Sequence, residues 1–247
     1  MTALSIYNSK FLARRPSEDA RQYSYRAIKA NILRLVLKPG EKMSEIDFAH
    51  SLQVSRTPVH ESFVKLSREN LVDIIPNQGA YVAKLNCQRI NDALWIHSQL
   101  GITMLQNIYA RNLHASELNT LNYMLSKLEE CIDEQKNDQI PRIIIEYYHQ
   151  LYMAAGNMQY IWESLQKTDG DLQRLLNLIV TNDLIARALL MELTELTNAL
   201  TERQIDRACS IFRNHITHLS MFLEPIKQFN TDYFVDDNET KEMEDRS

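Results

Sequence analysis

The feature that most constrains this chain is a pair of short helical patterns joined by a very tight connection. The first is expected over residues 44–52 with Ser44 as its cap, and the second begins at Ser55 or Thr57. In the second helix the apolar positions recur at helical spacing, at Val59, Phe63 and Leu66. The segment "VSRTP" places polar residues at its start and outside the apolar face, a pattern typical of a helix presented to something outside the protein.

The flanking segments complete a recognisable order of elements. A helix is predicted from Arg21 to Leu37, ended by the dipeptide Pro39-Gly40. After Asn70, "LVDIIPNQGAYVAKL" has two short β-rich runs around a turn in which Gly79 is free to adopt positive φ. Three helices and a hairpin predict a winged helix-turn-helix, with the third helix entering the major groove of DNA.

The rest of the chain has helical apolar periodicity to about residue 225. The predicted fold is therefore mainly α: a winged helix-turn-helix with a β-hairpin wing, followed by an all-α bundle of six or seven helices. The predicted boundaries are a flexible arm over 1–18, the winged helix over 19–85, the bundle over 86–229 and an acidic disordered tail over 230–247.

Charge divides along the same boundary. Residues 1–85 carry 13 Lys and Arg against 8 Asp and Glu, whereas the remaining residues carry 14 against 24. A basic first domain and an acidic second one are expected when only the first meets phosphate. Three scattered cysteines indicate reduced thiols, and we find neither a signal peptide nor an apolar run long enough for a membrane span. We therefore expect a cytoplasmic protein with no membrane partner.

Two motifs resemble a known family. The segment "LKPGEKMSEIDFAHSLQVSRTPVHESFVKLSRENLVDIIPNQGAYV" closely resembles the DNA-binding domain of GntR-family transcriptional regulators, whose usual form contains VSRTPVREAL and a wing ending in G-x-x-V. The segment "YYHQLYMAAGN", residues 147–157, resembles the F-H-x-x-L-x-x-A-S-G-N motif of the FCD-type effector domain found in the FadR subgroup.

The resemblance implies which residues contact DNA. Arg56 and Thr57 match positions that touch base edges and phosphates in these regulators; an arginine can offer two donors to guanine and a threonine hydroxyl can donate to phosphate. His60 stands where the family has arginine, so we expect weaker phosphate binding or an altered half-site preference. The candidate DNA-binding residues are Ser44, Ser55, Arg56, Thr57, His60, Gln78 and Gly79.

Many FCD domains hold a divalent metal through an Asp, a His four residues later, and two further His on later helices. The resemblance is taken to place His149 at the motif position and His215 at the last ligand position. The other two positions are then Ile145 and Leu193, which cannot ligate. Two imidazoles alone would hold zinc or nickel weakly. No cofactor is assigned, and a metal stays an alternative to buried histidines that hydrogen-bond each other, a neighbour or the effector.

FCD pockets usually bind small carboxylates, including sugar acids. The arginine that the family carries in the first helix of this domain is His97 here, and its glutamate is Gly101. The resemblance therefore leaves open a less anionic effector, or an anchor at Arg174 or Arg187. The candidate effector-binding residues are His97, Glu146, His149, Arg174 and His215.

The sequence predicts a homodimeric, ligand-responsive transcriptional regulator, acting as a repressor on a pseudo-palindromic operator, and not an enzyme. One alternative is a metal-dependent helical enzyme, which would need a complete metal shell or a paired acid and base. The other is a helical interaction module whose winged helix binds protein. Salt distinguishes this interaction module from the DNA-binding regulator, because phosphate binding weakens steeply as salt rises.

Overall fold

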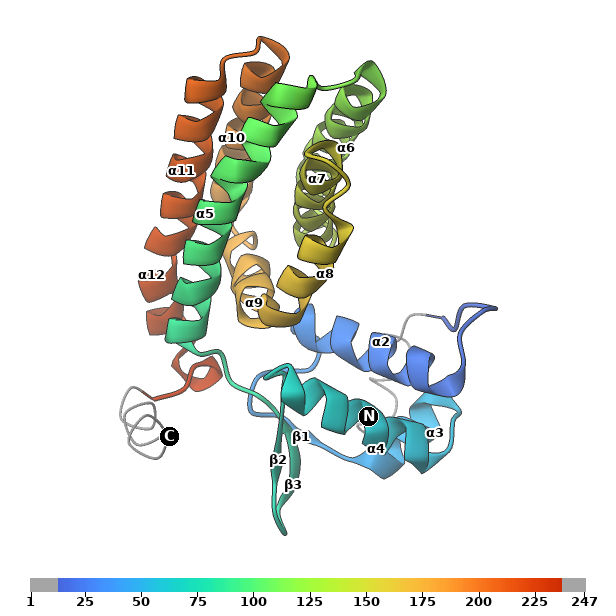
Figure 1. Ribbon diagram of the computed structural model, residues 1–247. Helices are drawn as coiled ribbons and strands as arrows, with labels where there is room; N and C mark the ends of the chain where they lie inside the picture. The colour runs from blue at the N-terminus through green and yellow to red at the C-terminus, as the bar shows by residue number, and fades with distance from the viewer. Residues whose placement is uncertain (1–12, 237–247) are drawn as a thin grey trace. The chain divides into compact units, whose positions relative to one another are not determined.

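The computed structural model describes residues 13–236, and these form two compact units (Figure 1). The first contains the residues up to Cys87 together with those from Asn230 onward, and the second spans Gln88–Phe229. The chain therefore passes from the first unit to the second and returns. Within the described residues, no helix is long and apolar enough to span a bilayer.

The first unit is a winged helix-turn-helix, as the sequence predicted. Its apolar core lies under α4 and includes Ile28, Phe48, Val59 and Phe63, all nearly inaccessible to solvent. The sequence did not reveal β1, a two-residue strand that makes the wing a three-stranded antiparallel sheet in the order β1-β3-β2. The elements are α2 (Ala20–Leu33), β1 (Lys42–Met43), α3 (Glu45–Leu52), α4 (Arg56–Arg68), β2 (Val72–Ile75) and β3 (Gly79–Val82).

Helix α2 ends four residues before the predicted position. Leu35 adopts a left-handed conformation with φ of 58°, and the amides of Val36 and Leu37 both bond to the carbonyl oxygen of Asn31. This closing turn supplies donors to a carbonyl oxygen at the helix end, where no intrahelical amide is available. The prediction of a helix through Leu37 was wrong because a left-handed leucine gives no sequence signal comparable to glycine.

Both chain ends of the first unit are more ordered than the sequence indicated, as far as the structure describes them. Residues 13–18 are held by Arg26, whose guanidinium binds Glu18 and the carbonyl oxygen of Ala13. Phe234, after the short helix η1 (Thr231–Tyr233), is 1 % exposed, and its segment pairs in parallel with Leu85. The predicted disordered tail is thus wrong for residues 230–236, while residues 1–12 and 237–247 lie outside the described residues.

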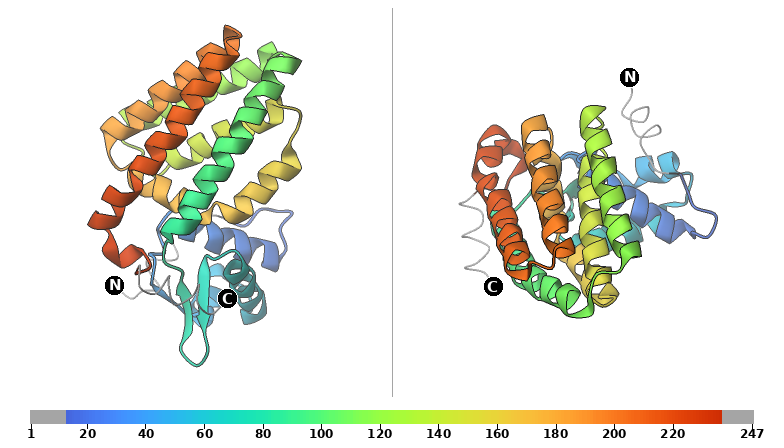
Figure 2. Two further views of the ribbon diagram at one scale, coloured as in Figure 1. Left: turned by 60° about the vertical axis from the view of Figure 1, so that its left-hand side comes forward. Right: turned by 90° about the horizontal axis from the view of Figure 1, so that it is seen from above.

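The second unit is an all-α bundle. Helices α10 and α11 pack along each other, as do α6 and α7, and α10 also packs on α6 (Figure 2). Where six or seven helices were expected, the described residues contain eight, because α8 and α9 are separate short helices joined at Asp169 and α12 follows α11. The helices are α5 (Cys87–Arg111), α6 (Ala115–Asp133), α7 (Ile140–Ala154), α8 (Gln159–Thr168), α9 (Gly170–Ile179), α10 (Asp183–Thr201), α11 (Ile205–Met221) and α12 (Leu223–Phe229).

Candidate functional site

The start of α4 is the first site. Ser55 is the extended residue before the helix, and its side chain makes no capping hydrogen bond. Pro58 fits in the first turn because an amide there has no intrahelical acceptor. It is buried with Val59, whereas Arg56, Thr57 and His60 are exposed. One turn of α4 therefore presents three polar side chains to solvent while its other face holds the helix on the core.

Glu45 on α3, whose role no sequence pattern indicated, holds two of these side chains. The Nε atom of Arg56 lies 2.7 Å from Oε2 of Glu45, and Nδ1 of His60 lies 2.8 Å from Oε1 of the same carboxylate. Burial alone would raise the pKa of Glu45, but the hydrogen bonds from His60 and Arg56 outweigh it and lower that pKa. Ser44 precedes Glu45 and caps α3, because its hydroxyl oxygen accepts a hydrogen bond from the amide of Asp47 at 3.3 Å. The hydroxyl hydrogen of Ser44 therefore stays available for an external acceptor.

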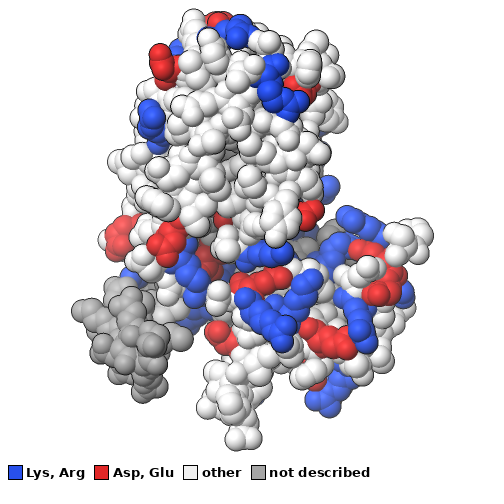
Figure 3. All heavy atoms as spheres, in the orientation of Figure 1, with Lys and Arg blue, Asp and Glu red and all other residues white. Residues whose placement is uncertain are grey.

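The turn at the tip of the wing exposes backbone and uncharged side chains. Between β2 and β3 the turn carries Asn77 and Gly79 at positive φ, and the amide of Gln78 bonds to the carbonyl oxygen of Ile75. Gly79 at φ of 114° is in a region that other residues rarely adopt. On the face shown in Figure 3, Lys and Arg gather over the helices of the first unit, while most of the second unit's visible face carries neither sign of charge.

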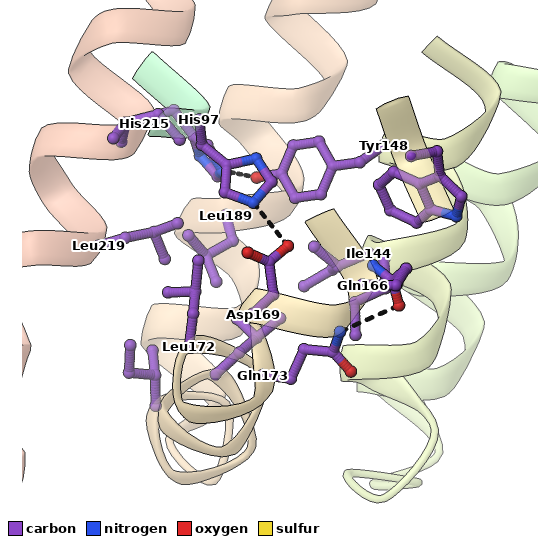
Figure 4. Close-up of a pocket in the computed structure, with 15 residues that line it drawn as sticks. His97, Ile144, Tyr148, Gln166, Asp169, Leu172, Gln173, Leu189, His215 and Leu219 are labelled. Carbon is purple, nitrogen blue, oxygen red and sulfur yellow. Dashed lines mark hydrogen bonds and ion pairs between the residues drawn. The ribbon is translucent and has the colours of Figure 1, made fainter. Parts of the chain in front are cut away.

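The second site is a cavity inside the helical unit. Its space is about 590 Å³ when the part open to solvent is included. Apolar side chains from four helices form most of the wall, and Trp162 and Tyr148 add aromatic surface (Figure 4). The lining residues are His97, Ile144, Ile145, Tyr148, Trp162, Gln166, Asp169, Leu172, Gln173, Leu176, Ile179, Leu189, His215, Ile216 and Leu219.

Two sets of hydrogen bonds join polar side chains at this cavity. His97 on α5 reaches Asp169, with Nε2 2.8 Å from Oδ2 (Figure 4). His215 on α11 lies between Tyr148, which contacts its Nε2, and Glu192, whose Oε2 is 2.6 Å from its Nδ1. Burial raises the pKa of Tyr148, so its hydroxyl keeps the proton and donates to Nε2. That leaves Nδ1 of His215 as the donor to Glu192.

The structure places the five candidate effector residues in different surroundings. His97 and His215 line the cavity. Glu146, His149 and Arg174 are not among its lining residues. His149 stacks on Trp162 with ring centroids 5.2 Å apart, and its Nε2 bonds to Gln159 while Nδ1 faces Glu146 at 3.3 Å.

Neither arginine considered as an anchor lines the cavity. Arg174 is fully buried and bonds to Asp171, which also binds Arg89. Arg187 lies on the surface and pairs with Asp133. The described lining therefore contains no Lys or Arg side chain.

Comparison with known proteins identifies both units. Residues 22–82 match the family described as "Bacterial regulatory proteins, gntR family", and residues 105–218 match the FCD domain. The chain belongs to the GntR family. It carries the FCD effector domain of the FadR-like subgroup, and it is a transcriptional regulator rather than an enzyme.

Relatives of the whole chain agree with this assignment. The HTH-type transcriptional repressor RspR of Escherichia coli is 23 % identical over 222 residues, which cover 90 % of this chain and 96 % of RspR. E. coli McbR/YncC shares the fold, with a TM-score of 0.74 at 19 % identity over 86 % of this chain and all of that one. A GntR regulator structure from Rhodococcus sp. RHA1 has a TM-score of 0.68 at 16 % identity, over 81 % of this chain and 95 % of the other.

The FCD motif itself has to be placed one residue earlier than the sequence analysis placed it. Laid letter by letter on residues 147–157, the motif His falls on Tyr148, not on His149. The cavity agrees, because Tyr148 points at His215 while His149 lies outside the lining. The position four residues earlier is then Ile144, which is also buried in the cavity wall.

These residues do not fit a divalent metal. Of the four family ligand positions, three are Ile144, Tyr148 and Leu193, and the fourth, His215, already uses both ring nitrogens within the protein. No group of three or more His, Cys, Asp or Glu side chains with metal-binding geometry occurs within residues 13–236. Protein sites for zinc or nickel supply three or four ligands, so this GntR regulator lacks the FCD metal site in its family form.

Proposed function

We propose that this GntR regulator is a ligand-responsive repressor that binds its operator as a homodimer in the cytoplasm. The observation that carries the proposal is the start of α4, where Arg56, Thr57 and His60 stand exposed on a winged helix-turn-helix. The name of RspR, a repressor that this chain resembles over nearly its whole length, supports repression. One recognition helix per chain and a pseudo-palindromic operator together require two chains.

The DNA contacts follow from the exposed groups. Arg56 can give two donors to guanine O6 and N7, and the hydroxyls of Ser44, Ser55 and Thr57 can donate to phosphate. His60 adds a ring donor. At the wing, Gln78 and Gly79 are exposed, so the turn can approach the backbone or the minor groove.

The cavity supplies the effector site. A molecule bound there would contact α5, α7, α9 and α11 together, and it would stabilise whichever arrangement of the dimer's DNA-binding units fits the filled cavity. The resulting change in the free energy of operator binding cannot exceed the difference in the effector's binding free energy for the two arrangements. His97 and His215 are the candidate effector residues that line this cavity.

A gel shift with the DNA upstream of the regulator's own gene tests the DNA part. We expect a complex that resists excess nonspecific competitor and weakens steeply between low and high salt. Random-site selection that recovers no preferred sequence would refute operator binding. Sedimentation at micromolar concentration should give twice the mass of one chain, and a monomer would refute the dimer.

A further inference from the structure

One polar atom in the effector cavity has no partner. Asp169 lies at the junction of α8 and α9 and is 3 % exposed. Its Oδ2 atom is bonded to His97, but Oδ1 is buried without a hydrogen bond within the described residues. In Figure 4 a dashed line joins His97 to one oxygen of Asp169, and the second oxygen carries none. A buried carboxylate oxygen is costly when unpaired, so a donor from outside the chain would stabilise it.

Four other polar side chains of the cavity form hydrogen bonds in pairs. Tyr148 and His215 are bonded to each other, and Nε2 of Gln173 lies 3.0 Å from Oε1 of Gln166. Nine of the fifteen lining residues are aliphatic or tryptophan, so the remaining wall is apolar. The cavity therefore offers a buried, unpaired carboxylate oxygen in a mostly apolar enclosure.

The charge of the wall disfavours an anion. Its one carboxylate is Asp169, and its described residues include no Lys or Arg that would offset a second negative charge. Without a metal or an arginine, a carboxylate ligand would have to lie near Asp169 with only imidazoles to stabilise it. Burying an uncompensated charge is strongly unfavourable.

We propose that the effector of this regulator is a mainly apolar small molecule that carries an N–H or O–H donor for Oδ1 of Asp169, bears no carboxylate and binds without a metal. This inference rests on the proposed function, since it names the ligand class of the same cavity. An amine and an alcohol both satisfy it, and the experiment distinguishes them.

The two tryptophans make the binding directly measurable. Trp162 lines the cavity, whereas Trp95 is 66 % exposed on α5 and does not. A Trp95→Phe background leaves Trp162 as the one tryptophan emitter. Three probes share a six-membered ring and differ only in the head group: cyclohexylmethylamine, cyclohexylmethanol and cyclohexanecarboxylate. We expect saturable changes in Trp162 emission with the first two, and affinity about tenfold or more weaker for the carboxylate.

Asp169→Asn tests the assigned atom. The amine should lose about tenfold or more in affinity because the negative charge is gone, the alcohol should lose less, and the carboxylate should bind more tightly. Glu195→Gln is the matched control, since this exposed carboxylate on α10 does not line the cavity, and it should change none of the three. Thermal unfolding of each variant checks that it is folded. If Asp169→Asn does not fold, the order of the three probe affinities on the Trp95→Phe protein still tests the inference, because that protein keeps Asp169.

Several results would overturn the inference: a carboxylate that binds as tightly as the other probes, no saturable binding by any probe, an equal loss for all three in Asp169→Asn, or binding abolished by EDTA. None of these bears on operator binding, which the gel shift measures without any probe. A competitor-resistant gel shift that a carboxylate releases would keep the proposed function and reject this ligand class.

Discussion

Each unit of this regulator uses one glutamate to hold side chains at its site, but the held residues differ in exposure. Glu45 holds Arg56 and His60, whose side chains are 67 % and 60 % exposed. Glu192 holds His215, whose side chain is 2 % exposed in the cavity wall, and also His218, which is 50 % exposed and does not line the cavity. The first pair of contacts is exchangeable with water and DNA, whereas the second fixes a ring inside a cavity wall.

The difference indicates how the two sites are built. The exposed side chains at the start of α4 come from residues 55–60, so helix geometry places most of them, and Glu45 of the preceding helix holds two of them. The cavity draws its lining from residues between His97 and Leu219, so its polar matching depends on how distant helices meet. The following experiments test this contrast, beginning with the largest expected effect.

The anchoring of the returning segment in the first unit should depend on Phe234. Phe234→Ala empties a nearly inaccessible site beside Leu85 and should lower the free energy of unfolding by about 3–5 kcal/mol. Phe229→Ala makes the same change five residues earlier, where the ring is 87 % exposed, and should cost under about 0.5 kcal/mol. Urea denaturation measures both, and equal effects would mean that the segment after α12 is not anchored.

Close packing in the effector unit should depend on Gly101. A Cβ atom at this position would overlap the ring of Phe212 on α11. Helix propensity favours alanine by roughly 0.5–1 kcal/mol, so net destabilisation in Gly101→Ala would show that the overlap dominates. We expect a net loss of about 1–3 kcal/mol in thermal or urea unfolding. In a Phe212→Leu background the loss should shrink, and additive effects would contradict direct contact.

The DNA-facing site should instead tolerate substitution without unfolding. Arg56→Ala should weaken operator binding by about 1–3 kcal/mol, five- to a hundredfold or so, with unchanged urea unfolding. Arg68→Ala removes the same charge from the far end of α4 and should weaken operator binding less, because it loses only a diffuse attraction. Matched losses for the two variants in a gel shift would remove the base contact assigned to Arg56.

Acid should remove the stabilisation that Glu192 provides. Burial raises the pKa of Glu192, but hydrogen bonds from His215 and His218 outweigh it and lower that pKa. A lowered folded pKa stabilises the protein above the unfolded value of about 4.3, and this stabilisation is lost as pH falls through the folded value. The stability difference between the unmodified protein and Glu192→Gln should therefore be constant near neutrality and shrink below about pH 4.3. Urea unfolding across pH 3–7 measures it; a constant difference would refute the coupling.

The smallest expected effect concerns Glu45. Glu45→Gln should change stability by less than about 1 kcal/mol, because its partners are exposed. It should raise affinity for random duplex by removing negative charge, and lower the ratio of operator to random binding because Arg56 loses its orienting contact. Asp47→Asn removes a neighbouring charge from α3 without touching Arg56, so only the first effect is expected. Fluorescence anisotropy with both duplexes measures the ratio, and identical ratios would contradict the orienting role.

The sequence by itself was sufficient for the fold class and for the exposed side chains at the start of α4. Cap residues, helical periodicity and turn chemistry act over a few residues, and they predicted α3, α4, the wing turn and the exposed side chains at the start of α4. The same local reasoning failed at Leu35, where a left-handed leucine ends α2 without a glycine, and at β1, which is too short to show a period.

Only the tertiary structure decided the cavity. Asp169 follows α8 with no motif around it, and Glu192 gives no sign in the sequence that it faces α11. Strict alignment of the FCD motif places Tyr148 at the motif histidine position. The adjacent His149 is the residue type that usually ligates a metal, and it drew the assignment instead. The hydrogen-bond partners of His97, Tyr148 and His215 lie 23 to 72 positions away in the chain, and local sequence patterns carry no information on how such distant residues meet.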